Sequence, residues 1–292
     1  MNLIIGSHVS FNKNEQLLGS VKEALSYDAN TFMFYTGPTQ SRLRYPIEDI
    51  LSYEAYKLML DNNINPNNVI VHSPYIINLA NNVDKEKYKF YIDFLTEELE
   101  RVKMLGFNKL VLHPGSATTV SKEEGIKSIA NAINIAYENV KDVSILLEYM
   151  AGKGNEIGSN IDEIKGIINL VNDKERIFVC LDTCHINDSG ININEFDKFL
   201  DEFDSKIGID KIKCVHVNDS MNPIGSHKDR HENIGYGTIG FDALINVIYN
   251  ERLNNIPFIL ETPYINRGAK DSKAPYKYEI ENIRNKKFTS FK

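Results

Sequence analysis

The sequence contains few cysteines and no long apolar run. Cys180, Cys184 and Cys214 are an odd set of three without a CxxC motif, which is typical of reduced thiols rather than of a disulfide framework. No apolar run reaches 18 residues, so a membrane-spanning helix is not expected. The first residues, Met1–Gly6, enter an apolar run without the basic segment of a signal peptide. We therefore expect a cytoplasmic protein that does not bind membranes.

Basic residues are also fewer than acidic residues. The 292 residues include 33 Lys and Arg against 40 Asp and Glu, a net charge of −7. Because phosphate binding usually requires a basic face, this balance alone favours an enzyme that acts on a small molecule. The conflict with nucleic-acid binding weakens if several carboxylates hold divalent cations, since each ion reverses the local charge.

Linkers rich in proline, glycine or serine are absent, so we predict a single domain over residues 1–292. Short β-branched runs alternate with longer amphipathic stretches in the rhythm of a (β/α)₈ TIM barrel, an α/β fold. Their apolar character fits parallel strands covered on both faces, although periodicity alone leaves a doubly wound sheet open. The eight runs are Leu3–Val9, Thr31–Tyr35, Val69–His72, Lys109–His113, Ser144–Glu148, Ile177–Asp182, Ile212–Val217 and Pro257–Glu261.

Four stretches between these runs have the three- and four-residue apolar spacing of helices. One of them opens with Ser121 and Glu124, the pattern of a capping box. The most irregular part of the chain is residues 218–240, and long loops inside compact domains tend to carry function. The four predicted helices are Lys85–Leu105, Ser121–Val140, Asn160–Val171 and Phe241–Glu251.

Histidines and carboxylates fall at the ends of six successive strand-like runs, and the strand ends of a parallel barrel share one face. Taken singly, each of them is as readily a hydrogen-bonded polar residue as a ligand. Together they predict metal, because burying several carboxylates without a counter-charge is very costly. The nine candidate ligands are His72, His113, Glu148, Asp182, His185, His216 and Glu261, with Asp229 and His231 from the long loop.

Imidazole and carboxylate ligands suit zinc, manganese or iron. Nine ligands exceed what one ion uses, so two or three ions with a bridging carboxylate fit better. Clustered divalent ions suit phosphodiester hydrolysis, because they lower the pKa of a water to about 7 and hold the attacked and leaving oxygens.

Two further patterns point to other chemistry. Residues 235–240 spell GxGxxG before a helical stretch, but a dinucleotide-binding motif follows a strand directly, and the last strand-like run ends near Val217. We expect these glycines to shape the loop instead. Cys184 could be a ligand or a nucleophile, yet its neighbours already supply harder ligands, so we expect a small buried thiol.

The segments that carry these residues resemble the endonuclease IV family of apurinic/apyrimidinic endonucleases. The similarity spans residues 6–263, nearly the whole chain, and is most specific in Asp-Thr-Cys-His at 182–185 and Asp-Arg-His-Glu-Asn-Ile-Gly at 229–235. The other similar segments are Gly6–Ser10, Val71–Asn78, Leu112–Ser116, Leu147–Gly152, Val215–Ser220 and Leu260–Pro263.

This resemblance implies a TIM barrel with three Zn²⁺ ions, with Mn²⁺ as an alternative at one site. The implied reaction is hydrolysis of duplex DNA 5′ to an abasic site, leaving a 3′-hydroxyl and a 5′-deoxyribose phosphate, together with removal of blocking groups from damaged 3′ ends. Glu148, as a bridge between ions, and Glu261, which would orient the attacking hydroxide, are the implied catalytic residues. The implied ligand sets are His72, His113 and Glu148, then Glu148, Asp182, His216 and Glu261, then His185, Asp229 and His231.

The resemblance also implies side chains that wedge into the minor groove of bent DNA. Tyr75 and Ile76 match one wedge, with simple packing of their loop as the alternative reading. The second wedge region, residues 36–42, departs from some relatives in length and order, so the inserting residue stays open among Gln40, Ser41 and Arg42. Candidate phosphate contacts are Lys228, Arg230 and Arg267.

Two alternatives accompany this prediction. A sugar-isomerase-like barrel would need one or two metals and would not need the third ligand set. A catalytically silent binder of damaged DNA is the other, although a complete ligand set suggests retained chemistry. Nothing in the sequence requires more than a monomer.

Overall fold

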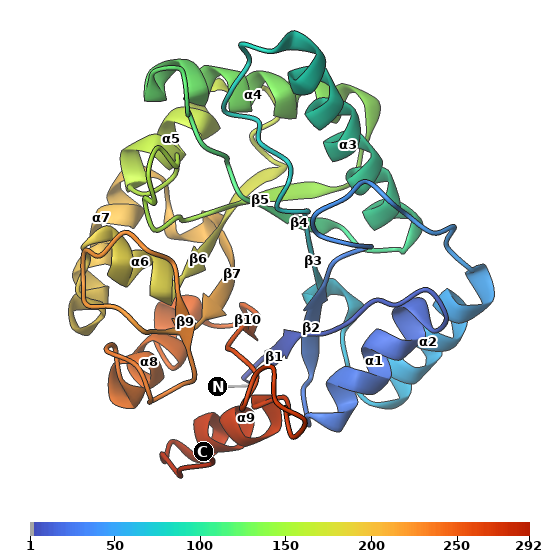
Figure 1. Cartoon of the computed structure of the whole chain (residues 1–292), viewed down its shortest axis with the longest axis vertical. Coiled ribbons are helices and arrows are strands. Elements are labelled where there is room, and N and C mark those ends of the chain that lie inside the picture. The colour runs from blue at the N-terminus through green and yellow to red at the C-terminus, as the bar shows by residue number, and fades with distance from the viewer. Residues whose placement is uncertain (1–2) are drawn as a thin grey trace.

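The computed structural model describes residues 3–292, in which eight parallel strands form a closed barrel (Figure 1). The strands lie in the order β1-β10-β7-β6-β5-β4-β3-β2. All eight predicted strands and the TIM barrel are confirmed, and closure of the sheet excludes the doubly wound alternative. The barrel strands are β1 Ile5–His8, β2 Thr31–Phe34, β3 Ile70–His72, β4 Lys109–Leu112, β5 Ser144–Glu148, β6 Ile177–Asp182, β7 Ile212–Val217 and β10 Phe258–Leu260.

Helices surround the barrel on its outside (Figure 1). Their apolar faces pack on the strands, because each strand alternates between an inward and an outward side chain. The helices are α1 Gln16–Ser26, α2 Asp49–Asp61, α3 Lys85–Met104, α4 Lys122–Asn139, α5 Ile161–Leu170, α6 Thr183–Ser189, α7 Phe196–Lys206, α8 Phe241–Ile248 and α9 Tyr276–Asn285, with 3₁₀ turns η1 Pro66–Asn68, η2 Ile193–Glu195, η3 Ile209–Lys211 and η4 Glu251–Leu253.

The four predicted helices are present, and one of them ends earlier than predicted. At α4 the Ser121 hydroxyl accepts from the Glu124 amide and the Glu124 carboxylate accepts from the Ser121 amide, as the capping box requires. The last predicted helix was expected to reach Glu251, but α8 ends at Ile248. The reason is local: Asn250 is extended and its side chain accepts from the Arg252 amide, which starts the separate turn η4.

The interior of the barrel is filled by one apolar residue from each of seven strands, all fully buried. The eighth strand, β1, has Gly6 instead, where a Cβ would lie 1.8 Å from the carbonyl oxygen of Thr31 on β2. Only glycine allows these two strands to approach so closely. The seven interior residues are Met33, Ile70, Val111, Leu146, Cys180, Cys214 and Ile259.

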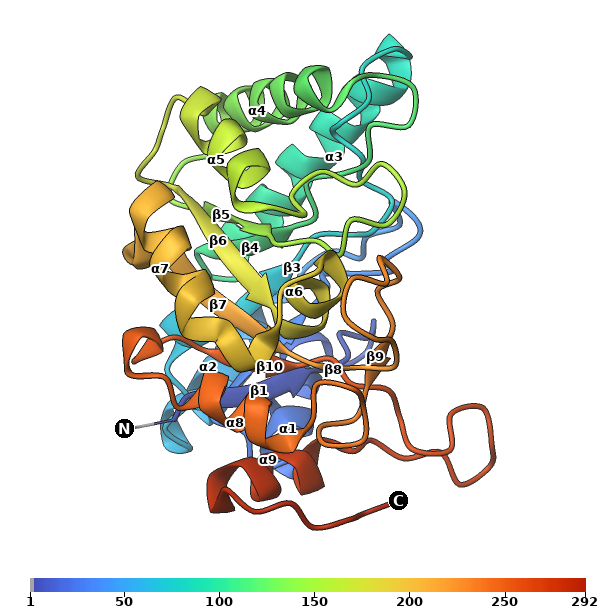
Figure 2. The same cartoon turned by 90° about the vertical axis from the view of Figure 1, so that its left-hand side faces the viewer.

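The predicted long loop contains regular structure. Two short strands, β8 Asp219–Ser220 and β9 His231–Glu232, pair in antiparallel register, with Ser220 opposite His231. Figure 2 shows this hairpin on the side of the barrel toward which the strand arrows point. The irregular loop expected over residues 218–240 is therefore partly a hairpin. Among residues 3–292, no helix has both the length and the apolarity needed to cross a membrane.

Candidate metal centre

Six of the predicted ligands occupy equivalent positions on six neighbouring strands. Each lies two residues beyond an interior core residue, as Glu148 does beyond Leu146 and His216 beyond Cys214. Because strand side chains alternate, a step of two returns to the inside of the barrel, one layer nearer its mouth. The six residues of this mouth layer are His72, His113, Glu148, Asp182, His216 and Glu261.

Glu148 lies at the centre of this layer and is 1% exposed. Its Oε2 is 3.1 Å from Nε2 of His72 and 3.0 Å from Nε2 of His113. Its Oε1 is 3.3 Å from Nδ1 of both His185 and His216. Burial opposes ionisation, but the charges of His113 and His216 hold the pKa of this carboxyl well below its usual range. Four imidazoles thus face one carboxylate.

A second cluster shares Glu148. Nδ1 of His216 lies 3.0 Å from Oε2 of Glu261 and 3.9 Å from Oδ2 of Asp182. One potential ligand atom from each of these four residues lies within 4.8 Å of the others. The same holds for His72, His113 and Glu148, so the two predicted ligand groups that share Glu148 are brought together.

The third cluster begins with α6. Asp182 caps this helix by accepting a hydrogen bond from the His185 amide at 2.8 Å, which turns the His185 ring into the mouth. Oδ1 of Asp229 then lies 3.0 Å from Nε2 of His185 and 3.4 Å from Nε2 of His231. Potential ligand atoms of Asp182, His185 and His231 also lie within 4.8 Å of one another. Two carboxylates, those of Asp182 and Asp229, therefore lie near His185 and His231, whereas the predicted third ligand set contained only Asp229.

The loop that carries Asp229 and His231 is fixed by two buried carboxylates outside the ligand sets. Asp188 of α6 accepts from the Asp229 amide at 3.0 Å and from the Ser220 hydroxyl at 2.7 Å. Asp219 accepts from three amides of residues 235–239 at 2.9 to 3.0 Å. The GxGxxG segment therefore wraps around a side chain of its own chain, and the prediction that its glycines shape the loop is confirmed.

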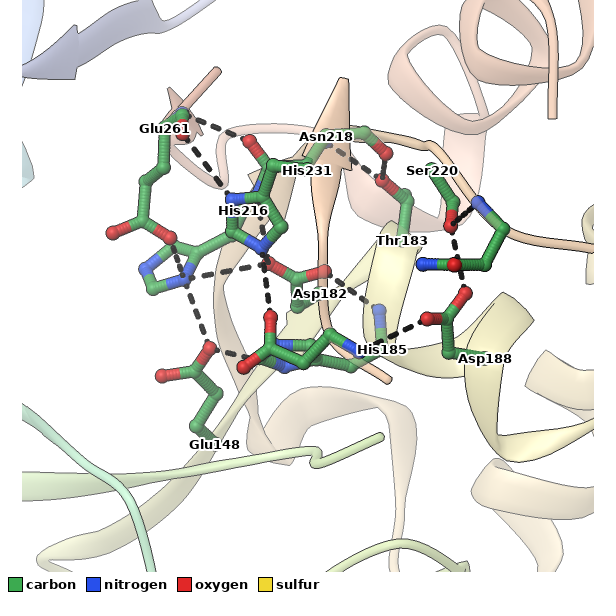
Figure 3. Close-up of polar contacts among 12 residues, drawn as sticks. Glu148, Asp182, Thr183, His185, Asp188, His216, Asn218, Ser220, His231 and Glu261 are labelled. Atoms are coloured by element: carbon green, nitrogen blue, oxygen red, sulfur yellow. Dashed lines mark hydrogen bonds and ion pairs between the residues drawn. The ribbon is translucent and has the colours of Figure 1, made fainter. Parts of the chain in front are cut away.

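Asn218 joins two of the predicted ligands (Figure 3). Its Nδ2 donates to Oδ2 of Asp182 at 2.7 Å, and its Oδ1 accepts from the Glu261 amide at 2.9 Å. The Thr183 hydroxyl in turn donates to the Asn218 carbonyl and accepts from its amide. This network fixes the carboxylates of β6 and the end of β10 relative to each other, and the sequence reasoning did not identify it.

Comparison with known proteins agrees with this geometry. A family model described as xylose isomerase-like TIM barrel matches residues 21–286. A probable endonuclease 4 from Acholeplasma laidlawii is 51% identical over 289 residues, covering 98% of this chain and 96% of that protein. A second, from Enterococcus faecalis, is 47% identical, covering 98% and 96%. The chain belongs to the endonuclease IV family.

Solved structures place this endonuclease IV family member in the same fold. Endonuclease IV from Thermus thermophilus superposes with a TM-score of 0.79 at 26% identity, covering 96% of this chain and 97% of the other. A D-tagatose 3-epimerase-like protein superposes with a TM-score of 0.67 at 18% identity, covering 96% of each chain. The second likeness shows only that the barrel fold is shared with sugar epimerases.

The donor set of this family member fits divalent cations. Four carboxylates lie among five imidazoles, and in the described part of the chain no lysine or arginine pairs with any of the four. Such a concentration of buried acids requires positive charge. Imidazole nitrogen and carboxylate oxygen together suit zinc or manganese. The centre can therefore hold divalent metal ions, and this family is metal-dependent.

The predicted DNA-contact residues lie in different surroundings. Tyr75 is 51% exposed, and its ring is 5.3 Å from that of His113 at the mouth. Ile76 packs partly against the core. Arg230 is exposed and lines an open pocket with Glu261 and Arg267. By contrast, Lys228 is exposed but not part of that pocket.

Arg42, from the second predicted wedge region, is engaged within the protein. Its Nε lies 2.7 Å from a carboxylate oxygen of Glu97, and its guanidinium is 5.3 Å from the ring centre of Phe90. Gln40 is exposed and Ser41 is half-buried beside it. The predicted buried thiol is also confirmed, since Cys184 is fully buried and free.

Proposed function

We propose that this chain is a DNA-repair endonuclease that hydrolyses the phosphodiester bond 5′ to an abasic site in duplex DNA. The products would be a 3′-hydroxyl and a 5′-deoxyribose phosphate, and the same hydrolysis would clear blocked 3′ ends. The observation that carries the proposal is the set of overlapping ligand clusters at the barrel mouth, two of which share Glu148. Relatives named probable endonuclease 4 at 47 to 51% identity support the same activity.

We assign the nine predicted residues to three Zn²⁺ ions, with Mn²⁺ as an alternative at one of them. The first ion would be held by the imidazoles that face Oε2 of Glu148, and the second by the cluster around His216. The third would be held by the histidine pair that faces Asp229. When bound, such ions lower the pKa of water and offset the charge of the attacked phosphate.

Two carboxylates would act directly on the reaction. Glu148 holds the clusters at a fixed spacing, because its two oxygens face different imidazoles. Glu261 has 13% of its side chain exposed at the pocket, where its carboxylate would accept a hydrogen bond from the attacking water and orient it toward phosphorus. Asn218 keeps Glu261 in place through the backbone amide.

The charge of the mouth then accommodates DNA in spite of the acidic chain. Three Zn²⁺ ions would bring six positive charges against the four carboxylates of the centre, leaving about two positive charges there. Arg230 and Arg267 border the same pocket and would hold flanking phosphates. Lys228 would make an outer contact, and Arg42 a weaker one because Glu97 pairs with it. Tyr75 with Ile76 would form the wedge that opens the duplex.

We further propose that the enzyme is a monomer of the cytoplasm. The three cysteines are free and buried, which fits a reducing compartment.

The sugar-isomerase alternative is disfavoured, because an isomerase would not need the third cluster of His185, Asp229 and His231.

The test is a nicking assay with purified protein whose metal content is measured in parallel. A duplex oligonucleotide with one abasic site should be cut 5′ to the lesion, and about three zinc ions per chain should be found. Mild treatment with EDTA should leave the activity unchanged, because most ligands are buried. Absence of nicking by fully metallated protein, together with turnover of a ketose or aldose, would overturn the assignment.

A further inference from the structure

The mouth of the barrel contains two polar side chains that the proposed metal centre does not use. The step of two that leads from Leu146 to Glu148 also leads from Gly6 to His8 at the end of β1 and from Met33 to Tyr35 just after β2. Each of the eight barrel strands therefore contributes one inward residue to the mouth layer. Six of these residues are proposed ligands, and the remaining two are His8 and Tyr35.

Both residues have a buried polar atom without a partner. Tyr35 is 8% exposed, and its hydroxyl makes no hydrogen bond within residues 3–292. Nε2 of His8 is likewise buried and unpaired. Buried hydroxyl and imidazole groups are normally satisfied, because leaving them unpaired is costly. Two such atoms, on residues of neighbouring strands whose ring centres are 5.0 Å apart, therefore point to a group that arrives with the substrate.

The position of this pair identifies the part of the substrate it would meet. The Tyr35 ring centre lies 5.0 Å from that of His8, 4.9 Å from the proposed ligand His72 and 5.5 Å from the proposed wedge residue Tyr75. Tyr35 thus packs beside both a proposed ligand of the reaction centre and the residue that would displace the damaged nucleotide. The occupant of this position would be the nucleotide that leaves the stack.

The chemistry of the pair favours a hydroxyl group as that occupant. A tyrosine hydroxyl and an imidazole each donate and accept hydrogen bonds, as a hydroxyl does. Phosphate oxygens only accept, and the exposed cations Arg230 and Arg267, beside the pocket that Glu261 lines, suit them better. Loss of a base leaves a cyclic sugar with a new hydroxyl at C1′, which an intact nucleotide lacks.

We propose that Tyr35 and His8 bind the sugar of the abasic nucleotide, with the Tyr35 hydroxyl hydrogen-bonded to the C1′ hydroxyl. The inference rests on the proposed function and adds a specificity determinant to it. Tyr35 recognises the chemical product of base loss directly, whereas a narrow pocket alone would only exclude nucleotides that still have a base.

The test uses two duplexes that differ in one oxygen atom, a natural abasic site and its tetrahydrofuran analogue, which lacks the C1′ hydroxyl. We expect the wild-type kcat/KM to be about three- to tenfold higher for the natural site, the contribution of one neutral hydrogen bond. Tyr35→Phe should reduce the natural-site value to that of the analogue and leave the analogue unchanged. Tyr53→Phe, 68% exposed on α2, should change neither value.

A second variant, His8→Asn, should also narrow the preference for the natural site, and the zinc content and thermal midpoint of both variants should match the wild type. If Tyr35→Phe lowers kcat/KM equally for the two substrates, the hydroxyl contacts phosphate or His72 instead, and the proposal is overturned. An unchanged preference would overturn it as well. If the wild type cuts neither duplex, the proposed function itself fails. If the wild type cuts both duplexes and Tyr35→Phe keeps the wild-type preference for the natural abasic site, only this inference fails.

Discussion

The carboxylate of Asp188 accepts a hydrogen bond from the backbone amide of Asp229, with 3.0 Å between Oδ2 and N. Asp182 caps α6 from the end of β6, and His185 and Asp188 lie three residues apart on the helix, so these two are neighbours on its surface. Asp229 itself has a φ of 54°, a left-handed conformation that side chains other than glycine rarely adopt. The short helix α6 together with its N-cap therefore supplies two proposed ligands and fixes the backbone that carries a third.

The first prediction is that Asp188→Ala weakens the third metal site. Without the carboxylate, Asp229 loses its anchor, so zinc affinity at that site should fall by about 10- to 100-fold, as is usual when a residue that orients a ligand is removed. Zinc titration of the stripped protein should show one weakened site of three, and excess zinc should restore nicking. Asp188→Asn keeps one acceptor oxygen and should be milder. Wild-type affinity at all sites in Asp188→Ala would contradict this role.

The second prediction concerns Glu261. Replacement by Gln keeps the shape of the side chain but removes the charge that would orient the attacking water. Single-turnover nicking should slow by about 100-fold or more, while fluorescence anisotropy should show DNA binding close to that of the wild type. Asp61→Asn, an exposed acid at the end of α2, is the matched control. Nicking near the wild-type rate in Glu261→Gln would remove Glu261 from the reaction.

The third prediction is a pH dependence of the metal-free protein. Burial opposes protonation of His231, but Asp229 and Asp182 raise its pKa to about 9 from an ordinary 6.5. The folded state therefore holds this proton more tightly, and its stabilising contribution is complete below pH 6.5 and lost as the pH rises through 9. The thermal midpoint of zinc-stripped protein should fall between pH 6.5 and 9. In His231→Gln, the decrease of the thermal midpoint between pH 6.5 and 9 should be smaller. A thermal midpoint of the zinc-stripped wild type that rises over this pH range would refute the prediction.

The fold could be predicted because its signals are local. Apart from β1, each barrel strand consists mainly of apolar residues, and the Ser121–Glu124 capping box marks the start of α4 in the sequence itself. The early end of α8 could not be predicted, because an asparagine at position 250 is equally compatible with a helix until its side chain is seen to accept from Arg252. Whether the sheet closes depends on contacts between β1 and β10, which periodicity does not report.

The candidate ligands were predictable because histidines and carboxylates at strand ends converge by topology. Asn218 and Asp188 were not, since each acts through hydrogen bonds to residues 32 to 43 positions away. His8 and Tyr35 carried a signal that was available in the sequence. Both stand at the end of a predicted strand, two residues after an inward position, and applying the alternation to all eight strands would have found them.

The last prediction separates two arginines that the sequence analysis placed at the DNA interface, Arg42 as a candidate wedge residue and Arg230 as a candidate phosphate contact. Arg230 is exposed beside the pocket that Glu261 lines, so Arg230→Ala should weaken binding to undamaged and damaged duplexes together and lower the slope of log Kd against log salt by about one. Arg42 is held by Glu97 and Phe90, so Arg42→Ala should change that slope less. Binding isotherms at four salt concentrations measure both slopes. A larger effect at Arg42 would show that it leaves Glu97 to contact DNA, because only a freed guanidinium can replace a counterion on the phosphate backbone.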